Sequence, residues 1–377
     1  MTDRKKLGIY IHIPFCLRKC FYCDFCSFPD TDGELVSKYC EELCRRIKEK
    51  AVDCREYTVD TVYFGGGTPT LLPIGAFYKL FSALKESFDI KKGAEITVEC
   101  NPATADRAYF DELLSLGANR LSIGLQSVNE NELSALGRVH SFDDFFIAFS
   151  DAREAGFKNI SVDLMYGIPE QTRGSFEYSI DKVLELKPEH ISSYGLKIEE
   201  NTVFAKTKDK LVLPNEDEEF LFYKILTDKL AQNGYHKYEI SNFSLDGFES
   251  KHNTRYWLGE EYIGFGVAAH SFFDSERYGN SRDIKAFIDG KDITEERRIL
   301  SEHEADEEYV MLRLRLALGI DKTEFERKFG ESFTHRYPYV SLMLKEGFMQ
   351  ENDGHISFTD KCFFVSNYIL SEMLELE

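Results

Sequence analysis

The chain has 377 residues, of which 43% are hydrophobic and 14% aromatic, so it can bury one large domain and a smaller one. Its formal net charge of −20, from 66 acidic and 46 basic residues, disfavours nucleic acid as a partner. No apolar run predicts a transmembrane segment or a signal peptide, and nine cysteines without an obvious pairing pattern fit a reducing compartment, so a cytoplasmic location is expected.

Short apolar runs of strand character alternate with helical periodicity over the first two hundred residues. Strands are predicted over 8–13, 61–65, 95–100, 120–125, 160–167 and 190–196, and helices near 34–50, 74–88, 104–116, 142–155 and 173–186. Asp106 and Asp143 are expected to begin two of these helices, and Gly117 and Gly156 to end them. Six βα units are two short of a closed barrel, which favours an α/β fold with a partial TIM barrel of (β/α)6 type.

The alternation fades after residue 200. A charged helix is expected over about 215–233, and the chain becomes helical from about residue 302, where ADEEYVMLRLRLALG carries an apolar stripe. Three regions are therefore predicted. They are a partial-barrel core over 1–235, a connecting segment with the motif HNTRYW over 236–300, and a smaller helical C-terminal subdomain over 301–377.

Four cysteines, Cys16, Cys20, Cys23 and Cys26, lie within eleven residues directly after the first predicted strand. The first three have C-x3-C-x2-C spacing, and thiolates on one short loop can hold an iron–sulfur cluster. Three ligands for four irons would leave one iron open for a substrate. A structural zinc site would need a second pair of ligands, whereas a four-cysteine electron-transfer cluster with Cys26 as fourth ligand stays open as an alternative.

Other polar motifs also follow predicted strands, where ligands bind in parallel α/β folds. The glycines of GGGTP, residues 65–69, allow close approach of a ligand, although a tight turn is an equal alternative. Glu99, Gln126 and Asp163 lie in or at the ends of strands, and Arg138 lies in LGRVH. A buried carboxylate is costly unless it is satisfied, so either a salt bridge with Arg138 or a polar ligand is expected there.

The ordered motifs YIHIPFC, C-x3-C-x2-C, FGGGTPTLL, NRLSIGLQS, LGRVH, DLMYGIP, YEISNF and HNTRYW resemble the HemW branch of the radical S-adenosylmethionine (SAM) enzymes over nearly the whole chain. That branch is related to the oxygen-independent coproporphyrinogen III oxidases. The resemblance implies that Cys16, Cys20 and Cys23 ligate a [4Fe–4S] cluster whose open iron binds SAM. Electron transfer would cleave SAM to methionine and a 5′-deoxyadenosyl radical. By motif position, the SAM site would be lined by Tyr10, Tyr22, Gly66, Gly67, Thr68, Glu99, Gln126, Arg138 and Asp163.

The HNTRYW segment is associated with haem binding in proteins of this branch. A neutral imidazole at His252 could ligate haem iron, with Tyr256 and Trp257 packing the macrocycle. His270 is a second candidate ligand. A structural cluster that joins the barrel to the C-terminal subdomain is the alternative.

The resemblance implies a haem chaperone that binds haem and transfers it to a haem-requiring apoprotein, with a reductant such as flavodoxin or ferredoxin as a further partner. The alternative is coproporphyrinogen III oxidation, and whether the chain is an enzyme stays open at this point. The oxidase has an N-terminal extension and a further cysteine, where this chain has fifteen residues before Cys16 and Phe25 in place of that cysteine. A plain electron-transfer protein is a third possibility. Cys26 could be a spare thiol, a substitute ligand or part of the core.

Overall fold

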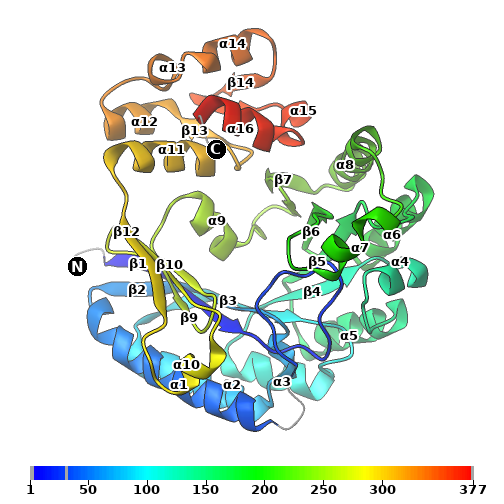
Figure 1. Ribbon diagram of the computed structural model, residues 1–377, viewed down its shortest axis with the longest axis vertical. Coiled ribbons are helices and arrows are strands. Elements are labelled where there is room, and N and C mark those ends of the chain that lie inside the picture. The colour runs from blue at the N-terminus through cyan, green and yellow to red at the C-terminus, as the bar shows by residue number, and fades with distance from the viewer. Residues whose placement is uncertain (1–3, 30–32, 375–377) are drawn as a thin grey trace.

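The computed structural model describes residues 4–29 and 33–374 and is built around one twelve-stranded sheet (Figure 1). Strands β1 to β6 lie side by side in chain order and pair in parallel, as the predicted βα units require. These strands are β1 (Lys5–Ile13), β2 (Tyr57–Gly66), β3 (Ile90–Cys100), β4 (Arg120–Gln126), β5 (Ile160–Tyr166) and β6 (His190–Gly195). The predicted partial barrel is therefore confirmed, and the carboxyl ends of its strands meet at one edge.

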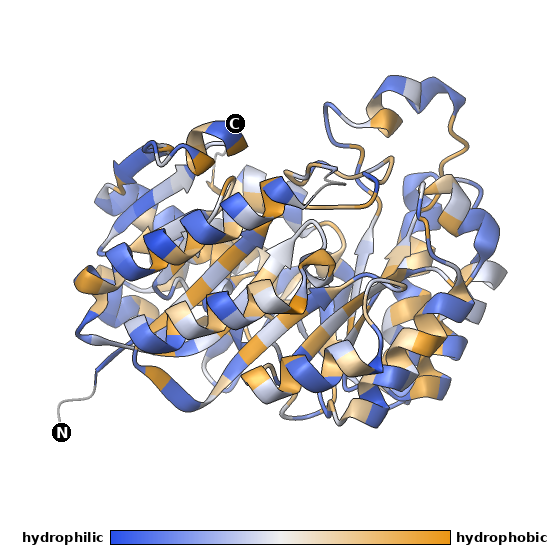
Figure 2. Cartoon of the chain, turned by 90° about the horizontal axis from the view of Figure 1, so that it is seen from below, coloured by the Kyte–Doolittle hydropathy of each residue, from blue (hydrophilic) through white to orange (hydrophobic). Residues whose placement is uncertain are grey.

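Helices connect these strands and cover the outer face of the sheet. They are α1 (Glu34–Lys50), η1 (Ala51–Cys54), η2 (Pro69–Leu71), α2 (Ile74–Ser87), α3 (Arg107–Leu116), α4 (Glu130–Ala135), α5 (Phe142–Ala155) and α6 (Arg173–Leu186). Seen from below, the outer helices mix hydrophilic and hydrophobic residues, whereas the strands behind them are mostly hydrophobic (Figure 2). This pattern is that of amphipathic helices packed on a buried parallel sheet.

Helix ends follow the expected capping chemistry with one exception. The Asp106 side chain accepts a hydrogen bond from Tyr109 N at 2.9 Å and begins α3, and Gly117 and Gly156 end α3 and α5 in left-handed conformation. The prediction that Asp143 begins a helix was wrong. Ser141 begins α5, because its backbone is extended and its hydroxyl accepts from the third amide of the helix, which leaves Asp143 in the first turn.

The chain after residue 200 extends the same sheet at both edges. One edge gains β8 (Asn242–Ser244) and β7 (His236–Glu239), and the other gains β9 (Tyr262–Phe265), β10 (His270–Phe273), β11 (Glu276–Asn280) and β12 (Thr294–Ile299). β9 pairs in parallel with β1, while the strands beyond it are antiparallel. The helices of this region are α7 (Val203–Thr207), η3 (Lys208–Lys210), the predicted charged helix α8 (Glu216–Gln232), α9 (Lys251–Trp257) and α10 (Ile284–Ile288).

The C-terminal subdomain is mainly helical and lies above α9 in Figure 1. Its helices are α11 (Glu302–Arg313), α12 (Lys322–Phe329), α13 (Phe333–Arg336), α14 (Tyr339–Lys345), α15 (Asp360–Phe363) and α16 (Ser366–Leu374). A three-stranded sheet of β13 (Ile320–Asp321), β15 (His355–Phe358) and β14 (Met349–Asn352), which the sequence pattern did not predict, completes it. The subdomain has its own apolar cluster, and the backbone hydrogen bond from Ala317 N to Tyr238 O joins it to β7.

In the part of the chain that the structure describes, no helix combines the length and apolar character needed to span a bilayer.

Candidate functional site

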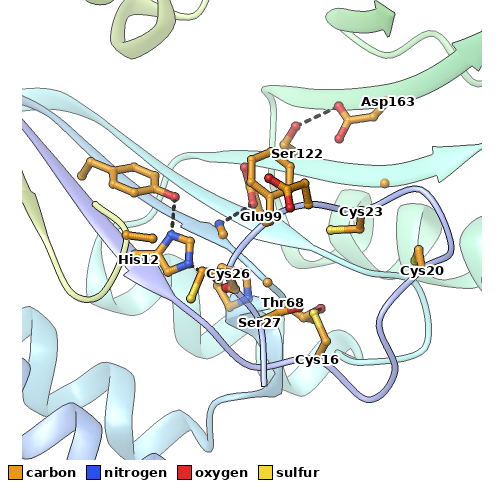
Figure 3. A pocket seen from close by; sticks show the side chains of 18 of the residues that line it. His12, Cys16, Cys20, Cys23, Cys26, Ser27, Thr68, Glu99, Ser122 and Asp163 are labelled. Atoms are coloured by element: carbon orange, nitrogen blue, oxygen red, sulfur yellow. Dashed lines mark hydrogen bonds between the residues drawn. The ribbon is translucent and has the colours of Figure 1, made fainter. Parts of the chain in front are cut away.

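The four clustered cysteines lie on the loop between β1 and α1, at the carboxyl end of β1 (Figure 3). Two backbone hydrogen bonds close the base of this loop, from Cys16 N to Phe28 O at 3.2 Å and from Phe28 N to Pro14 O at 2.6 Å. A third, from Phe21 N to Leu136 O at 3.0 Å, fixes its middle against the segment that follows α4. The loop is therefore held at three points, which presents its thiols to the interior of the barrel.

Donors from other elements reach two of the thiols. The Thr68 hydroxyl donates to Cys16 Sγ at 3.6 Å, and Arg138 Nη1 donates to Cys20 Sγ at 3.7 Å. Burial raises the pKa of the Cys16 thiol and raises that of Cys23 to about 11. Such thiols stay protonated at neutral pH unless a metal binds them, so this donor set fits an iron–sulfur cluster better than a free nucleophilic thiolate.

A chain of side chains joins the two thiols across the site. Asn101 Nδ2 donates to Thr68 Oγ1 at 2.6 Å, and Arg138 Nη2 donates to Asn101 Oδ1 at 2.7 Å. Cys16, Thr68, Asn101, Arg138 and Cys20 thus form one connected network. The sequence interpretation missed Asn101, although it directly follows β3 and could have been found by the same strand-end argument as Glu99.

Cys26 lies apart from Cys20, beside His12 (Figure 3). Its thiol is buried, and its carbonyl oxygen is 3.0 Å from His12 Nε2. The other ring nitrogen of His12 pairs with the Tyr10 hydroxyl at 2.9 Å. His12 therefore ties the end of the cysteine loop to β1, and the role of the Cys26 thiol stays open.

Two glycines, one at the end of β2 and one directly after it, allow β1 and the cysteine loop to approach closely. A Cβ at Gly66, where φ is +114°, would lie 2.6 Å from the His12 ring, and a Cβ at Gly67 would lie 2.6 Å from Phe15 O and 3.0 Å from Cys16 Sγ. Gly67 N also donates to Ile13 O at 2.8 Å. A side chain at Gly66 would displace His12, and one at Gly67 would displace the loop that carries the thiols, so close approach explains the glycines.

Two half-buried carboxylates line the cavity without forming an ion pair with a described residue. Glu99 accepts from Tyr63 Oη at 2.8 Å and from Gly66 N at 3.0 Å, and burial, with Asp163 nearby, raises its pKa to about 7. Asp163 accepts from Ser122 Oγ at 3.1 Å, and burial raises its pKa to about 6. Neither forms an ion pair with Arg138 within the described residues, so the salt-bridge alternative is not observed.

Gln126 ends β4 in a left-handed conformation, with φ of 72°, which is costly for a residue other than glycine. The pairing of β4 with β5 shifts register at this point. The side chain is buried and its Oε1 accepts from Tyr194 Oη at 3.0 Å. Backbone strain of this kind is held by surrounding structure and is common where a side chain must be aimed into a site.

All of these groups line one cavity of about 1350 Å³. Every residue predicted for the cluster and for SAM contributes to its wall: Tyr10, Cys16, Cys20, Tyr22, Cys23, Gly66, Gly67, Thr68, Glu99, Gln126, Arg138 and Asp163. Asn253 and Tyr256 of α9 and the exposed His270 of β10 line it as well. The structure thus brings together residues that the sequence spreads over more than 250 positions.

His252, the predicted haem ligand, lies beneath this wall rather than in it. Its side chain is 1% exposed, Nδ1 pairs with Thr61 Oγ1 at 2.9 Å, and Nε2 pairs with Tyr256 Oη at 2.8 Å. Burial, with Arg255 adding to it, lowers the pKa of the imidazole to about 3, so the ring is neutral. In this arrangement, Nε2 can reach haem iron only after the Tyr256 hydroxyl moves away.

Glu95 of β3 positions α9 against the sheet. Its two carboxylate oxygens accept from Lys251 N at 3.0 Å and from His252 N at 2.9 Å, which satisfies amides at the helix start. The helix that carries Tyr256 is therefore anchored on a barrel strand, between the cysteine loop and the C-terminal subdomain.

Comparisons with known proteins agree with this architecture. A family model of the radical SAM superfamily matches residues 10–183, and a model of the HemN C-terminal domain matches residues 300–365. The chain is 35% identical to the heme chaperone HemW of Lactococcus lactis, covering 98% of each chain, and 36% identical to that of Bacillus subtilis, covering 97% of this chain and 98% of the relative. It is 31% identical to the heme chaperone HemW of Escherichia coli, covering 100% and 99%.

Among solved structures, the coproporphyrinogen III oxidase HemN of Escherichia coli, a radical SAM enzyme, has the same fold. It superimposes with a TM-score of 0.85 at 24% identity and covers 98% of this chain and 89% of its own.

Proposed function

The chain belongs to the HemW heme chaperone family of the radical SAM superfamily, and from this premise we propose that it binds haem in its central cavity and transfers it to haem-requiring apoproteins. The observation that carries the proposal is that one cavity is bounded both by the cysteine loop and by α9 of the HNTRYW segment. A ligand held against α9 therefore lies in the same cavity as a group bound to the cysteines.

We assign the ligation of a [4Fe–4S] cluster to Cys16, Cys20 and Cys23. Arg138 and Thr68, which donate to two of these sulfurs, would stabilise their thiolate form once the metal is bound. A cluster with an open iron supplies a site for SAM and the electron that cleaves it.

The remaining residues of the wall would hold SAM. The carboxylates Glu99 and Asp163, which have no ion-pair partner among the described residues, suit amine and hydroxyl donors, and Gly66 and Gly67 line the same cavity. Hydrogen bonds and packing would orient SAM, and the side chains that would supply them are those of Tyr10, Tyr22, Gln126 and Thr68. These assignments rest on the convergence of the side chains on one cavity and on their motif positions.

Haem binding is assigned to the end of the cavity that α9 and β10 border. Tyr256 faces this space, and its hydroxyl bonds the neutral imidazole of His252, which lies directly behind it. Rotation of the Tyr256 side chain would open His252 Nε2 toward iron. His270 offers an exposed imidazole on the same wall without such a movement.

An anaerobic hemin titration of the cluster-reconstituted protein tests the proposal. We expect a saturable one-to-one Soret shift. This shift should weaken in His252→Ala or in His270→Ala, depending on which histidine supplies the ligand. Tyr256→Phe removes the hydroxyl that bonds His252 Nε2, so it should leave hemin binding intact or strengthen it. His303→Ala, an exposed histidine on α11, is the matched control. Loss of hemin to apomyoglobin, added as acceptor, would measure transfer.

Three outcomes would contradict the assignment. Non-saturating binding that ignores both histidines would remove the haem site. Formation of protoporphyrinogen IX from coproporphyrinogen III with SAM and reductant would favour the oxidase. A reduced cluster whose EPR signal is unchanged by SAM would favour a plain electron-transfer protein.

A further inference from the structure

Of the three predicted cluster ligands, Cys20 alone lines a second, small hollow beside the central cavity. This hollow has a volume of about 20 Å³, is also lined by Leu17, Arg18 and Val139, and shares Thr68, Asn101 and Arg138 with the wall of the main cavity. A hollow of this size has room for about one water molecule and no cofactor or substrate. The hollow is therefore not a ligand pocket, and the exposed residues around it form a surface that a partner can approach.

Apolar side chains are exposed around this hollow. Leu17 is 63% exposed and Val139 is 58% exposed. Arg18, which lines the same hollow, donates to Gly137 O at 2.7 Å. Apolar side chains beside exposed cations can contribute the water-free part of a contact with a docked protein.

A second segment, far away in the sequence, lies against the cysteine loop. The hydrogen bond from Phe204 N to Phe21 O at 3.0 Å and the contact of the two rings, with centroids 6.3 Å apart, join α7 to the loop. Figure 1 shows α7 next to the dark blue cysteine loop. This contact brings the lysines of α7 and η3 to the same part of the surface.

The cysteine loop and the segment around α7 are rich in positive charge, although the whole chain is acidic. Within residues 16–23 and 202–212 there are five cations and one acidic residue, Asp209, although the whole chain has a net charge of −20. The five cations form what we call the basic patch: Arg18, Lys19, Lys206, Lys208 and Lys210. All are exposed, and none forms an ion pair with another described residue, whereas Asp24, the carboxylate that follows Cys23 on the same loop, pairs with Arg282 at 3.2 Å.

We propose that the basic patch, with Leu17 and Val139, is the docking surface for a small acidic protein that carries a low-potential electron. This inference rests on the cluster of the proposed function. Electron tunnelling weakens steeply with distance, and Cys20 is the cluster ligand that borders this surface. Complementary charge fits an acidic carrier and raises its association rate. In the step, a flavin hydroquinone of the carrier gives one electron to the oxidised 2+ cluster and becomes the semiquinone, while the cluster becomes 1+.

Charge reversal of the patch tests this proposal. The variant Lys206→Glu, Lys208→Glu, Lys210→Glu is compared with Lys91→Glu, Lys92→Glu, Lys158→Glu, which makes the same charge change at exposed positions near the opposite, amino ends of the strands. The probe is an acidic flavodoxin. Its binding to the full-length chain is measured by calorimetry, and cluster reduction by its hydroquinone is followed by stopped-flow absorbance at several salt concentrations.

We expect the patch variant to lower the affinity and the second-order rate constant by about tenfold or more at low salt, with a reduced salt dependence, while the control variant changes neither by more than about twofold. Reduction by photoreduced deazaflavin, which is small and needs no docking surface, should be equal in all three proteins. Equal losses in both variants, or flavodoxin kinetics that ignore the patch, would overturn the proposal.

The same variants distinguish an acidic protein from an anionic membrane as the partner of the patch. If the patch variant loses binding to vesicles of phosphatidylglycerol but keeps its reaction with flavodoxin, the surface binds membrane and the proposal fails. Iron content is measured in each preparation. A chain without a cluster would contradict the proposed function, and the calorimetric binding of flavodoxin would still decide whether the patch docks an acidic carrier.

Discussion

Replacement of Glu99 by glutamine should change how the stability of this protein depends on pH. Burial raises the pKa of the Glu99 carboxyl from 4.5 to about 7, although Tyr63 and Gly66 donate to it. A pKa shift of this size means that folding favours the neutral carboxyl over the ionised carboxylate by about 3 kcal/mol of free energy. The folded chain therefore bears this cost whenever Glu99 is ionised.

The direction of the pH effect on stability follows from the linkage between proton binding and folding. Because the pKa is higher in the folded state, that state keeps the proton to a higher pH than the unfolded chain does. The contribution of Glu99 is fully present below pH 4.5 and is lost as pH rises through about 7. Between pH 5 and pH 8, the free energy of unfolding of the wild type should fall by about 2–3 kcal/mol more than that of Glu99→Gln.

Urea unfolding of the cluster-free, full-length chain, followed by circular dichroism at pH 5, 6, 7 and 8, measures this difference. Asp111→Asn, which removes an exposed carboxylate from α3, is the matched control and should follow the wild type. Parallel pH profiles for the wild type and Glu99→Gln would refute the reasoning. The same substitution should weaken SAM binding in the cluster-loaded protein, as expected of a carboxylate kept for a ligand at the expense of stability.

Three further substitutions probe how the site is built. Gly67→Ala places a Cβ against the backbone of the cysteine loop, so it should lower the cluster content and reduce the free energy of unfolding by about 1–3 kcal/mol. Its control, Gly75→Ala, adds a Cβ in open space on α2 and should raise the free energy of unfolding by about 0.5–1 kcal/mol. Equal effects of the two substitutions in thermal unfolding would contradict this reasoning. Glu95→Gln keeps the shape but weakens charged bonds to the start of α9, and should cost about 1–2 kcal/mol and lower hemin affinity, unless α9 plays no part in haem binding. Asn101→Ala cuts the network between two cysteine sulfurs and should hasten iron loss to a chelator, and an unchanged rate would show that the network is not needed to retain the cluster.

Local pattern was enough to predict the parallel barrel. Each strand from β1 to β6 is a short apolar run between helical segments, and the order of parallel strands follows the chain because each crossover is short. The cysteine spacing predicted a cluster loop because three ligands to one cluster must come from a short stretch of chain. The position of Glu99 and Gln126 at strand ends placed them at one edge of the sheet.

Tertiary structure decided what depends on contacts between distant segments. Strands β9 to β12 gave little periodic signal, and their place beside β1 is fixed by backbone pairing with a strand some 250 residues earlier. The burial of His252 behind Tyr256 could not be read from HNTRYW, because the partner of its other ring nitrogen is Thr61 in β2. Likewise, Lys206 becomes a neighbour of the cysteine loop only through the packing of Phe204 on Phe21. Sequence periodicity encodes which side of a segment is buried, whereas the identity of the residues that cover it is settled only when the whole chain packs.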